Sequence, residues 1–316
     1  MSKEEEGENQ DEVYERLKNS RFKQQNLPAW RPVPTIGSTT VIFMSLGIIF
    51  VALGIIILVY ANKIIEVKER YDNKCSEGQQ NCPVHLHLNK TMKGDIMVYY
   101  EIHKFYQNHR RYVKSKNDDQ LKGIEVKEET LKKDCENALT NGDLGKENNW
   151  KGQCCLDPKA IAIPCGLIAK SFFNDIFKIE SSDNINIEID ETNIAWRADV
   201  KHKYQNMKDM SKQWIDMRDE HFIVWMRPAA FPNFRKLWGR IKKDLQEGDY
   251  TLKVDNNYNV SSFEGEKYII LSNINSFGGN NKFLGICYII VGGISIILSI
   301  VFIIGYSIHQ KKEKEE

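Results

Sequence analysis

The sequence has almost no net charge. Its 44 lysine and arginine residues and 43 aspartate and glutamate residues leave +1 over 316 residues. Binding to nucleic acid depends on a concentrated basic face that neutralises phosphates. We therefore expect no nucleic acid partner.

Motifs of the common enzyme classes are also lacking. The chain has no nucleophile elbow, zincin helix, phosphate-binding glycine loop or dinucleotide fingerprint. The nearest acid-base candidates are His103 and His109, which precede the basic pair at 110–111 and have no paired carboxylate in the sequence pattern. Asp118 and Asp119 lie in a polar region where burial is not expected to raise a pKa. We expect no catalytic residue and no cofactor. An ectoenzyme would require turnover by the isolated loop domain that is lost on replacing either histidine.

Two long stretches have no charged residue. They run from 32 to 62 and from 283 to 308, and each forms a helix longer than the roughly 30 Å of a bilayer core. We predict transmembrane helices at 36–61 and 283–308 around a domain at 62–282. The first block follows a polar segment and precedes no cleavage site, which is typical of a signal-anchor. Because neither span has an ionisable side chain, the two helices alone provide no charged translocation path.

The side of the membrane on which the domain lies is predicted from the residues of the loop rather than from the charges that flank the spans. Basic residues are nearly balanced around the first span. Six of the seven cysteines and both glycosylation sequons, at Asn89 and Asn259, lie in the loop. We predict a glycosylated lumenal or extracellular domain, with cytosolic tails at 1–35 and 309–316. The protein would then reside in the endoplasmic reticulum, the Golgi and endosomal system or the plasma membrane.

The loop cysteines allow fifteen disulfide connectivities. They are Cys75, Cys82, Cys135, Cys154, Cys155 and Cys165. The short separation favours a bond between Cys75 and Cys82. A bond between Cys135 and Cys165, if it forms, would destabilise the unfolded chain by about 3–4 kcal/mol. Cys154 and Cys155 are left over.

Zinc is the alternative use of the first cysteine pair. Cys75 and Cys82 are followed by His85 and His87, but this spacing does not match a usual zinc pattern. An oxidising compartment favours disulfides. We expect no metal site.

The domain between the spans is predicted to be α+β, with strands concentrated in its second half. Residues 185–189 alternate as a half-buried strand does, and 250–254 and 267–271 are strand-like segments bounded by turn residues. Segments 99–106 and 161–177 are apolar without a decisive period, so helix and strand remain open for them.

Two polar regions are expected to contribute little to the fold. Residues 114–149 are rich in charged residues and asparagine, which indicates an exposed excursion from the core. Residues 1–20 have too little apolar surface to offset ordering, and we expect no fold there. Residues 21–34 contain three prolines with Phe22 and Trp30, a composition that suggests an extended segment at the membrane surface.

Each span has a pair of glycines on one helix face. Gly47 and Gly54 are seven positions apart, as are Gly285 and Gly292. Glycine faces permit close approach by another helix, although ordinary glycine usage in membrane helices would give the same pattern.

A ligand-gated channel is the main alternative to an accessory role, because such channels also pair two spans with a cysteine-bearing domain. A channel needs a polar pore-lining face. The second span offers only Ser295, Ser299 and Ser307, and the first two share a face.

Several segments resemble one family along almost the whole chain. They are FKQQ at 22–25 and LPAW at 27–30, FYQNHRRYVKS at 105–115, PCG at 164–166, FND at 173–175, IAW at 194–196, FIVWMR at 222–227, FRKLWGRI at 234–241 and KFLGICYIIVGG at 282–293. These motifs are similar to those of the accessory β subunits of type-four P-type ATPases, the phospholipid flippases. That family is called the cell-division-cycle-fifty or ligand-effect-modulator family.

The resemblance implies two spans around a disulfide-linked domain built on antiparallel β-sheets. It implies a heterodimer with a flippase ATPase that holds the catalytic site and the lipid path. It also implies that the accessory chain assists folding, export from the endoplasmic reticulum and stability of the ATPase. Carried onto this sequence, the family pattern pairs Cys135 with Cys165 and retains Cys75 with Cys82. The family often has a sequon at the FND motif, which is absent here.

The resemblance also suggests where the chain meets its partner and the membrane lipids. We expect the loop domain to contact exposed loops of the ATPase. We expect the segment around Phe22, Lys23, Trp30 and Arg31 to contact its cytosolic face. The glycine faces of both spans are expected to pack on its helices.

Overall fold

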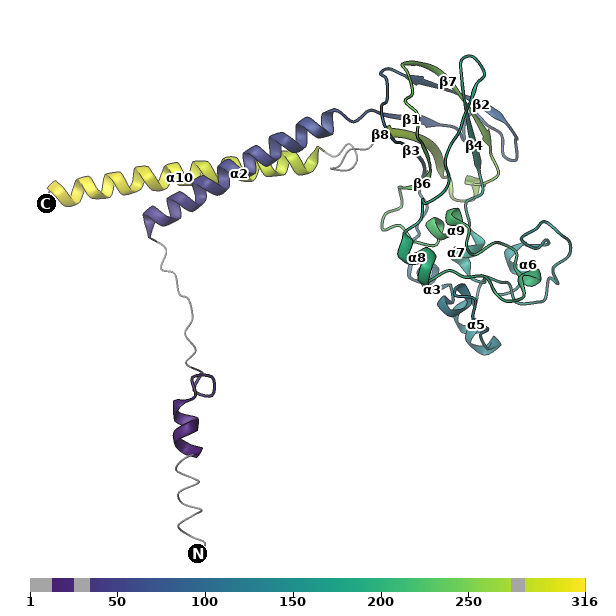
Figure 1. Cartoon of the computed structure of the whole chain (residues 1–316), viewed down its shortest axis with the longest axis horizontal. Coiled ribbons are helices and arrows are strands. Elements are labelled where there is room, and N and C mark those ends of the chain that lie inside the picture. Colours follow the sequence, from purple (N-terminus) through teal and green to yellow (C-terminus); the bar gives the residue numbers. More distant parts are fainter. Residues whose placement is uncertain (1–12, 26–34, 274–281, 316) are drawn as a thin grey trace, which may run out of the picture. The chain divides into compact units, whose positions relative to one another are not determined.

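The computed structural model describes residues 13–25, 35–273 and 282–315 (Figure 1). The chain divides into two compact units, one formed by residues 1–55 with 285–316 and the other by residues 56–284. The long loop between the two apolar stretches is therefore a domain of its own.

Both apolar stretches form helices of membrane-crossing length. Helix α2 covers Ile36–Asn62 and helix α10 covers Phe283–Glu315, and both are long and apolar enough to cross a membrane. Thr35 and Ser38 begin α2 with reciprocal bonds, because each hydroxyl accepts the other residue's backbone N–H, at 3.2 Å and 3.0 Å. Helix α10 continues beyond the predicted span end at 308.

The N-terminal tail contains a helix that composition did not predict. Residues 13–19 are helical, so the expectation of no fold across 1–20 was wrong for this part. The side-chain amide of Gln24 donates to the Leu17 carbonyl at 3.1 Å, and the Gln24 N–H donates to Ser20 O at 2.9 Å. The expectation rested on low apolar content, whereas these bonds satisfy carbonyl groups at the helix end.

The domain is a β-sandwich of two four-stranded antiparallel sheets. One sheet has the order β1-β8-β3-β6 and the other β2-β7-β4-β5. The strands are β1 Glu66–Arg70, β2 Cys82–Leu88, β3 Ile96–His103, β4 Ile176–Ser181, β5 Asn186–Ile187, β6 Phe234–Ile241, β7 Gly248–Asp255 and β8 Glu266–Asn273. Every pairing within the sheets is antiparallel. The chain therefore has the expected architecture of two membrane helices flanking a β-rich α+β domain.

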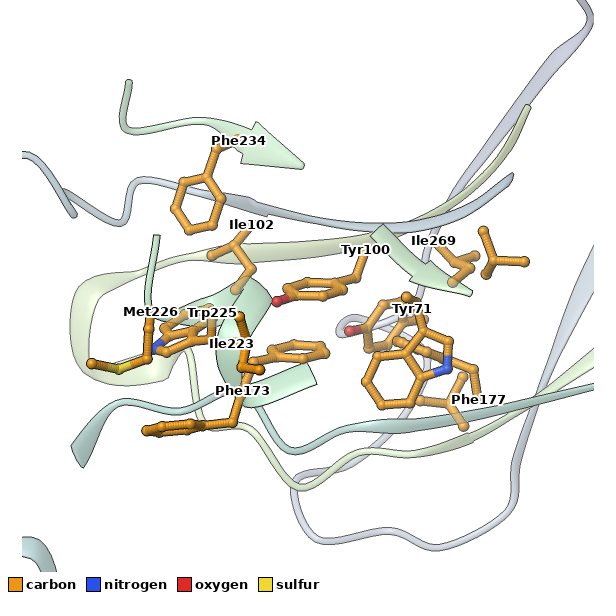
Figure 2. Close-up of a cluster of buried hydrophobic side chains, with 14 of the residues drawn as sticks. Tyr71, Tyr100, Ile102, Phe173, Phe177, Ile223, Trp225, Met226, Phe234 and Ile269 are labelled. Atoms are coloured by element: carbon orange, nitrogen blue, oxygen red, sulfur yellow. The ribbon is translucent and has the colours of Figure 1, made fainter. Parts of the chain in front are cut away.

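Large aromatic side chains fill the space between the sheets (Figure 2). Tyr100 of β3 stacks on Phe173 with ring centroids 3.9 Å apart. Phe177 of β4 meets Trp238 of β6 edge to face at 5.1 Å, which joins the two sheets. Trp225 also lies in this cluster and is fully buried.

The strand predictions differ in extent from the structure. Segments 250–254 and 267–271 lie within β7 and β8, whereas only two residues of 185–189 pair as β5. The undecided segment 99–106 begins within β3, which ends at His103. The other, 161–177, contains the one-turn helix α7 and the start of β4.

Short helices connect the strands outside the sandwich. They are α3 Arg110–Lys114, α4 Asp118–Leu121, α5 Glu128–Asp134, α6 Asn141–Leu144, α7 Leu167–Lys170, α8 Arg197–His202 and α9 Glu220–Trp225, with 3₁₀ turns at Met210–Lys212 and Ser261–Phe263. The prediction of an exposed excursion at 114–149 was wrong, since Leu121, Leu131, Ala138 and Leu144 join the core. The few apolar residues of this region are enough to pack it against the core, because most of them are buried.

Candidate partner-binding surfaces

The two membrane helices meet along their glycines. A methyl group at Gly47 would lie 2.9 Å from the Gly292 carbonyl oxygen, and one at Gly54 would lie 2.8 Å from the Gly285 carbonyl oxygen. Such distances are too short for any side chain larger than hydrogen. The order of these contacts makes the helix pair antiparallel.

Other side chains extend this helix contact toward the start of α2. Ser299 is fully buried, and its hydroxyl donates to the Thr40 carbonyl at 3.0 Å. Phe43 meets Phe302 with ring centroids 6.0 Å apart. The glycine faces that we expected to bind a partner's helices are thus occupied by the other span of the same chain. The sequence shows which face is small but not which helix will cover it.

Three disulfides join the cysteines of the domain. They link Cys75 to Cys82, Cys135 to Cys165 and Cys154 to Cys155. The first two are the pairs expected above, and the third joins the neighbours that the sequence left over. The first closes a short loop at the edge of the sandwich, while the second ties the helical region before α6 to the PCG segment. Cys287 in α10 is free.

A buried ion pair organises the region around the first disulfide. The Lys267 ammonium group of β8 donates to the Asp175 carboxylate at 2.6 Å, and both side chains have at most 1% exposure. Asp175 also accepts bonds from the Tyr71 hydroxyl at 2.7 Å and the Tyr258 N–H at 2.6 Å. The Asn256 side-chain amide accompanies the pair and donates to the Cys75 carbonyl at 2.9 Å. The ion pair thus connects the strands to the disulfide loop.

Burial shifts the protonation of this cluster. It raises the pKa of Asp175 and lowers the pKa of Lys267, and the ion pair only partly offsets both shifts. Burial also raises the pKa of Tyr71 well above its ordinary value, with a smaller contribution from the Asp175 charge. The tyrosine therefore stays a neutral donor to the carboxylate.

The FYQNHRRYVKS segment anchors loops rather than forming a reactive centre. Gln107 is buried, and its side-chain carbonyl accepts the Ala229 N–H at 2.8 Å. The Asn108 amide donates to Ala230 O at 2.9 Å, and the Tyr112 hydroxyl bonds to that of Ser171 at 2.8 Å. His109 is exposed. The matched motif therefore fixes the positions of neighbouring loops.

A second buried lysine, Lys236 of β6, binds the carbonyl groups at the C-terminus of helix α9. The Lys236 ammonium group donates to the carbonyl oxygens of Val224, Trp225 and Arg227 at 2.9, 2.8 and 2.6 Å. These bonds satisfy carbonyl groups at the C-terminus of the helix. Burial, with a smaller contribution from the Arg227 charge, lowers the pKa of Lys236 to about 7.

Beside this helix end lies an exposed tryptophan. Trp196 is 68% exposed, and the Arg227 guanidinium lies 5.1 Å from its ring centroid. Arg227 is held in turn by the buried carboxylate of Asp199. This cation–aromatic pair therefore places a large aromatic ring at the surface of the domain.

Comparison with known proteins identifies the family. A profile of the LEM3 (ligand-effect modulator 3) family / CDC50 family matches residues 58–312. The chain belongs to this family. It is similar to ALA-interacting subunit 3 of Arabidopsis thaliana, with 38% identity over 326 aligned positions that cover 94% of this chain and 88% of the relative. Cell cycle control protein 50A of Bos taurus is 36% identical, with 90% and 88% covered. Cell cycle control protein 50C of Macaca fascicularis is 31% identical, with 89% and 90% covered.

In this LEM3/CDC50 family member, the remaining predicted residues lie at the surface or outside the described residues. Phe22 is 76% exposed and Lys23 is exposed. Trp30 and Arg31 lie outside the described residues. Asn89 follows β2, while Asn259 precedes a 3₁₀ turn. Both asparagines are exposed, and their glycosylation stays a prediction.

Three of the histidines considered for catalysis or zinc binding, namely His85, His87 and His103, lie beside carboxylates of the sheets. His103 lies between Glu101 and Glu266, with one ring nitrogen near each carboxylate. His87 contacts Asp249 at 2.6 Å, and the described residues contain no group of three or more metal-ligating side chains.

The two buried lysines are the residues that sequence reasoning missed in this family member. Lys267 occupies the inward register of β8 with Ile269 and Leu271, and Lys236 occupies that of β6 with Phe234 and Trp238. Strict alternation would have placed both on the core face. A lysine at such a position signals a buried partner.

Proposed function

We propose that this chain is the non-catalytic accessory subunit of a type-four P-type ATPase that flips phospholipids toward the cytosolic leaflet. The observation that carries the proposal is family membership over residues 58–312, together with a relative named as an interacting subunit. In this heterodimer the ATPase supplies the catalytic site and the lipid path. The present chain supports folding of the ATPase, its export from the endoplasmic reticulum and its stability.

The spans support an assisting rather than a transporting role. Residues 36–62 and 283–308 contain no charged side chain, so these helices offer no charged path for a lipid headgroup. The glycine contact instead builds them into one closely packed pair that can stand beside a larger helix bundle.

The channel alternative gains no support from the second span. Each serine hydroxyl on that span is used within the chain, since Ser295 donates to Val291 O at 2.9 Å and Ser307 to Ile303 O at 2.9 Å. Ser299 donates to the first span. The three hydroxyl protons therefore bind backbone carbonyls rather than water or anions in a pore.

The proposed topology places the sandwich in the lumen or outside the cell and both tails in the cytosol. Disulfides support this side, because they persist in oxidising compartments. The sandwich would then contact exposed loops of the ATPase. Phe22 and Lys23 are exposed and would contact its cytosolic face together with Trp30 and Arg31.

The test is a mild-detergent pull-down of the tagged protein from its own cells, with mass identification of co-purified chains. We expect one P-type ATPase in near-stoichiometric amount. An unrelated tagged two-span protein serves as the control for chains that bind detergent micelles. Absence of any large ATPase would contradict the accessory role. Ligand-evoked currents from the chain expressed alone would then favour the channel.

A further inference from the structure

The tail segment formed by residues 13–25 has an exposed apolar face. Val13, Tyr14 and Leu17 fall within one arc of the helix, because their positions differ by one and four residues. Their exposed fractions are 50%, 67% and 37%. Phe22, in the turn that follows, is 76% exposed. The segment therefore presents several large apolar side chains to its surroundings.

A helix this short needs a surface to dock on. Isolated helices below about 12–15 residues are marginal in water, since nucleation is costly. The Gln24 bond to the Leu17 carbonyl contributes only one cap. Burial of the Val13 and Leu17 face against a second surface would provide the missing stabilisation.

The charges on the segment indicate which surface that is. Arg16 and Lys18 flank the apolar arc on either side, and Arg21 and Lys23 follow in the turn. Glu15 is the one acidic residue between 13 and 25, and it lies on the opposite side of the helix. Long basic side chains at the borders of an apolar face are typical of helices that lie on anionic bilayers.

The covalent connection keeps the segment near a bilayer. Helix α2 begins at Ile36, and the ten residues between Gln25 and Ile36 span at most about 40 Å when fully extended. A segment tethered in this way needs little intrinsic affinity for lipid, because the local concentration of lipid around it is high.

We propose that residues 13–25 bind the surface of the membrane that α2 crosses, with the apolar face among the headgroups and the basic residues on anionic phospholipids. Residues 1–12 contain six acidic residues and one basic residue, which oppose this attraction. Binding therefore requires a leaflet rich in anionic lipid. The helix face formed by Val13, Tyr14 and Leu17 meets the lipid, while Phe22 and Lys23 at the end of the segment would also reach the cytosolic face of the ATPase proposed above.

Amide hydrogen exchange of the full chain in lipid nanodiscs tests the proposal. One preparation holds phosphatidylcholine alone, and the other adds phosphatidylserine at about a third of the lipid. We expect exchange in residues 13–25 to slow by at least about fivefold with phosphatidylserine, since two or more basic residues reach the surface. Raising the salt to about 1 M should abolish the difference, because the screening length falls to about 3 Å.

Two variants that introduce the same charge distinguish docking of the apolar face on the membrane from a purely electrostatic attraction between the segment and the lipid. Leu17→Glu places a carboxylate on the apolar arc and should remove the protection, whereas Asn19→Glu places it on the polar side and should retain most of it. Equal exchange in both lipid mixtures would overturn the proposal. So would protection that appears only with a co-purified ATPase, which would identify the ATPase surface as the docking site.

Discussion

At the scale of single residues, the most informative feature is the pair of lysines inside the sandwich. Lys267 and Lys236 are both largely buried, yet each ammonium group has three acceptors. Buried charges persist where hydrogen bonds replace the lost water. The two lysines thus connect segments that the strands alone would not hold together.

Replacing Lys267 should unfold the domain more readily than replacing a surface lysine. Lys267→Ala leaves the Asp175 carboxylate buried without its cation, and we expect a loss of about 3–5 kcal/mol in the free energy of unfolding. Lys253→Ala removes a partly exposed pair with Glu180 and should cost about 0–1 kcal/mol. Tryptophan fluorescence during denaturant unfolding of the full chain in detergent measures both. Equal losses would show that the buried pair has no special role.

Asp199 should make the domain sensitive to acid. The hydrogen bond from Arg227 lowers its pKa, with a smaller contribution from Lys203. A group whose pKa is lower in the folded state contributes stability above its unfolded value of about 3.9 and loses it as the pH falls through the folded value. Stability should therefore fall below about pH 4, with a shallower slope in Asp199→Asn. Unfolding midpoints between pH 7 and 3 provide the measurement, and an unchanged slope would contradict the assignment.

Residue roles were only partly predictable from the sequence. The Cys75–Cys82 pair could be expected from its short separation, and the Cys135–Cys165 pair from the family resemblance, in a compartment where disulfides persist. The role of Asp175 was not predicted, since its three donors come from segments far away in the sequence. Long-range hydrogen bonds leave no local pattern.

At the scale of elements, the glycine contact makes a position-specific prediction. Gly292→Leu should destabilise the helix pair by about 1–3 kcal/mol, because a side chain there collides with the Gly47 carbonyl. Gly293→Leu is the matched control, since a methyl group at Gly293 has no atom within 4 Å. Thermal aggregation of the detergent-solubilised protein should begin at lower temperature only for the first variant. Identical onsets would argue against close packing of the spans.

The disulfide between Cys135 and Cys165 should matter more than the one between neighbouring cysteines. It closes a loop with a sequence separation of 30, whereas the Cys154–Cys155 bond has a separation of 1. Longer loops lose more unfolded-state entropy, so Cys135→Ser should cost about 2–5 kcal/mol and reduce delivery of the ATPase to its membrane. The double variant Cys154→Ser with Cys155→Ser is the control. Delivery is measured by surface biotinylation, and the structural role fails if both variants deliver equally.

The helices and strands that could be predicted are those with a long or regular pattern of apolar residues. The two spans were evident from uninterrupted apolar sequence, and β7 and β8 from strand-like segments bounded by turn residues. The helices at 118–144 were missed because they are one or two turns long and depend on tertiary burial and local caps. The tail helix at 13–19 was missed because it is only two turns long and its side chains are exposed. Short helices depend on contacts that composition does not record.

At the scale of the whole molecule, glycosylation reports the topology. If the sandwich lies in the lumen, removal of N-glycans should reduce the apparent mass of the full chain, and Asn89→Gln and Asn259→Gln should each abolish one step of that shift. Gel mobility before and after glycosidase treatment provides the measurement. A chain whose mobility never changes would contradict the lumenal position.

The architecture as a whole was more predictable than the surfaces that bind a partner. Two spans around a disulfide-linked β-rich domain follow from charge distribution, cysteine positions and the family motifs. The expectation for Gly47 and its counterparts shows the limit, because a small face can serve an internal or an external contact equally well. Only the fold decides between them.

The glycine contact between the two spans can form only late in the synthesis of the chain. Gly54 and Gly285 touch in the finished protein, but a ribosome adding about 5–20 residues per second reaches the second roughly 10–50 s after the first. During that interval the first span lies in the bilayer with its glycine face uncovered, while the whole sandwich emerges behind it. Newly made copies of this chain are therefore exposed to membrane quality control for a period set by the length of the sandwich.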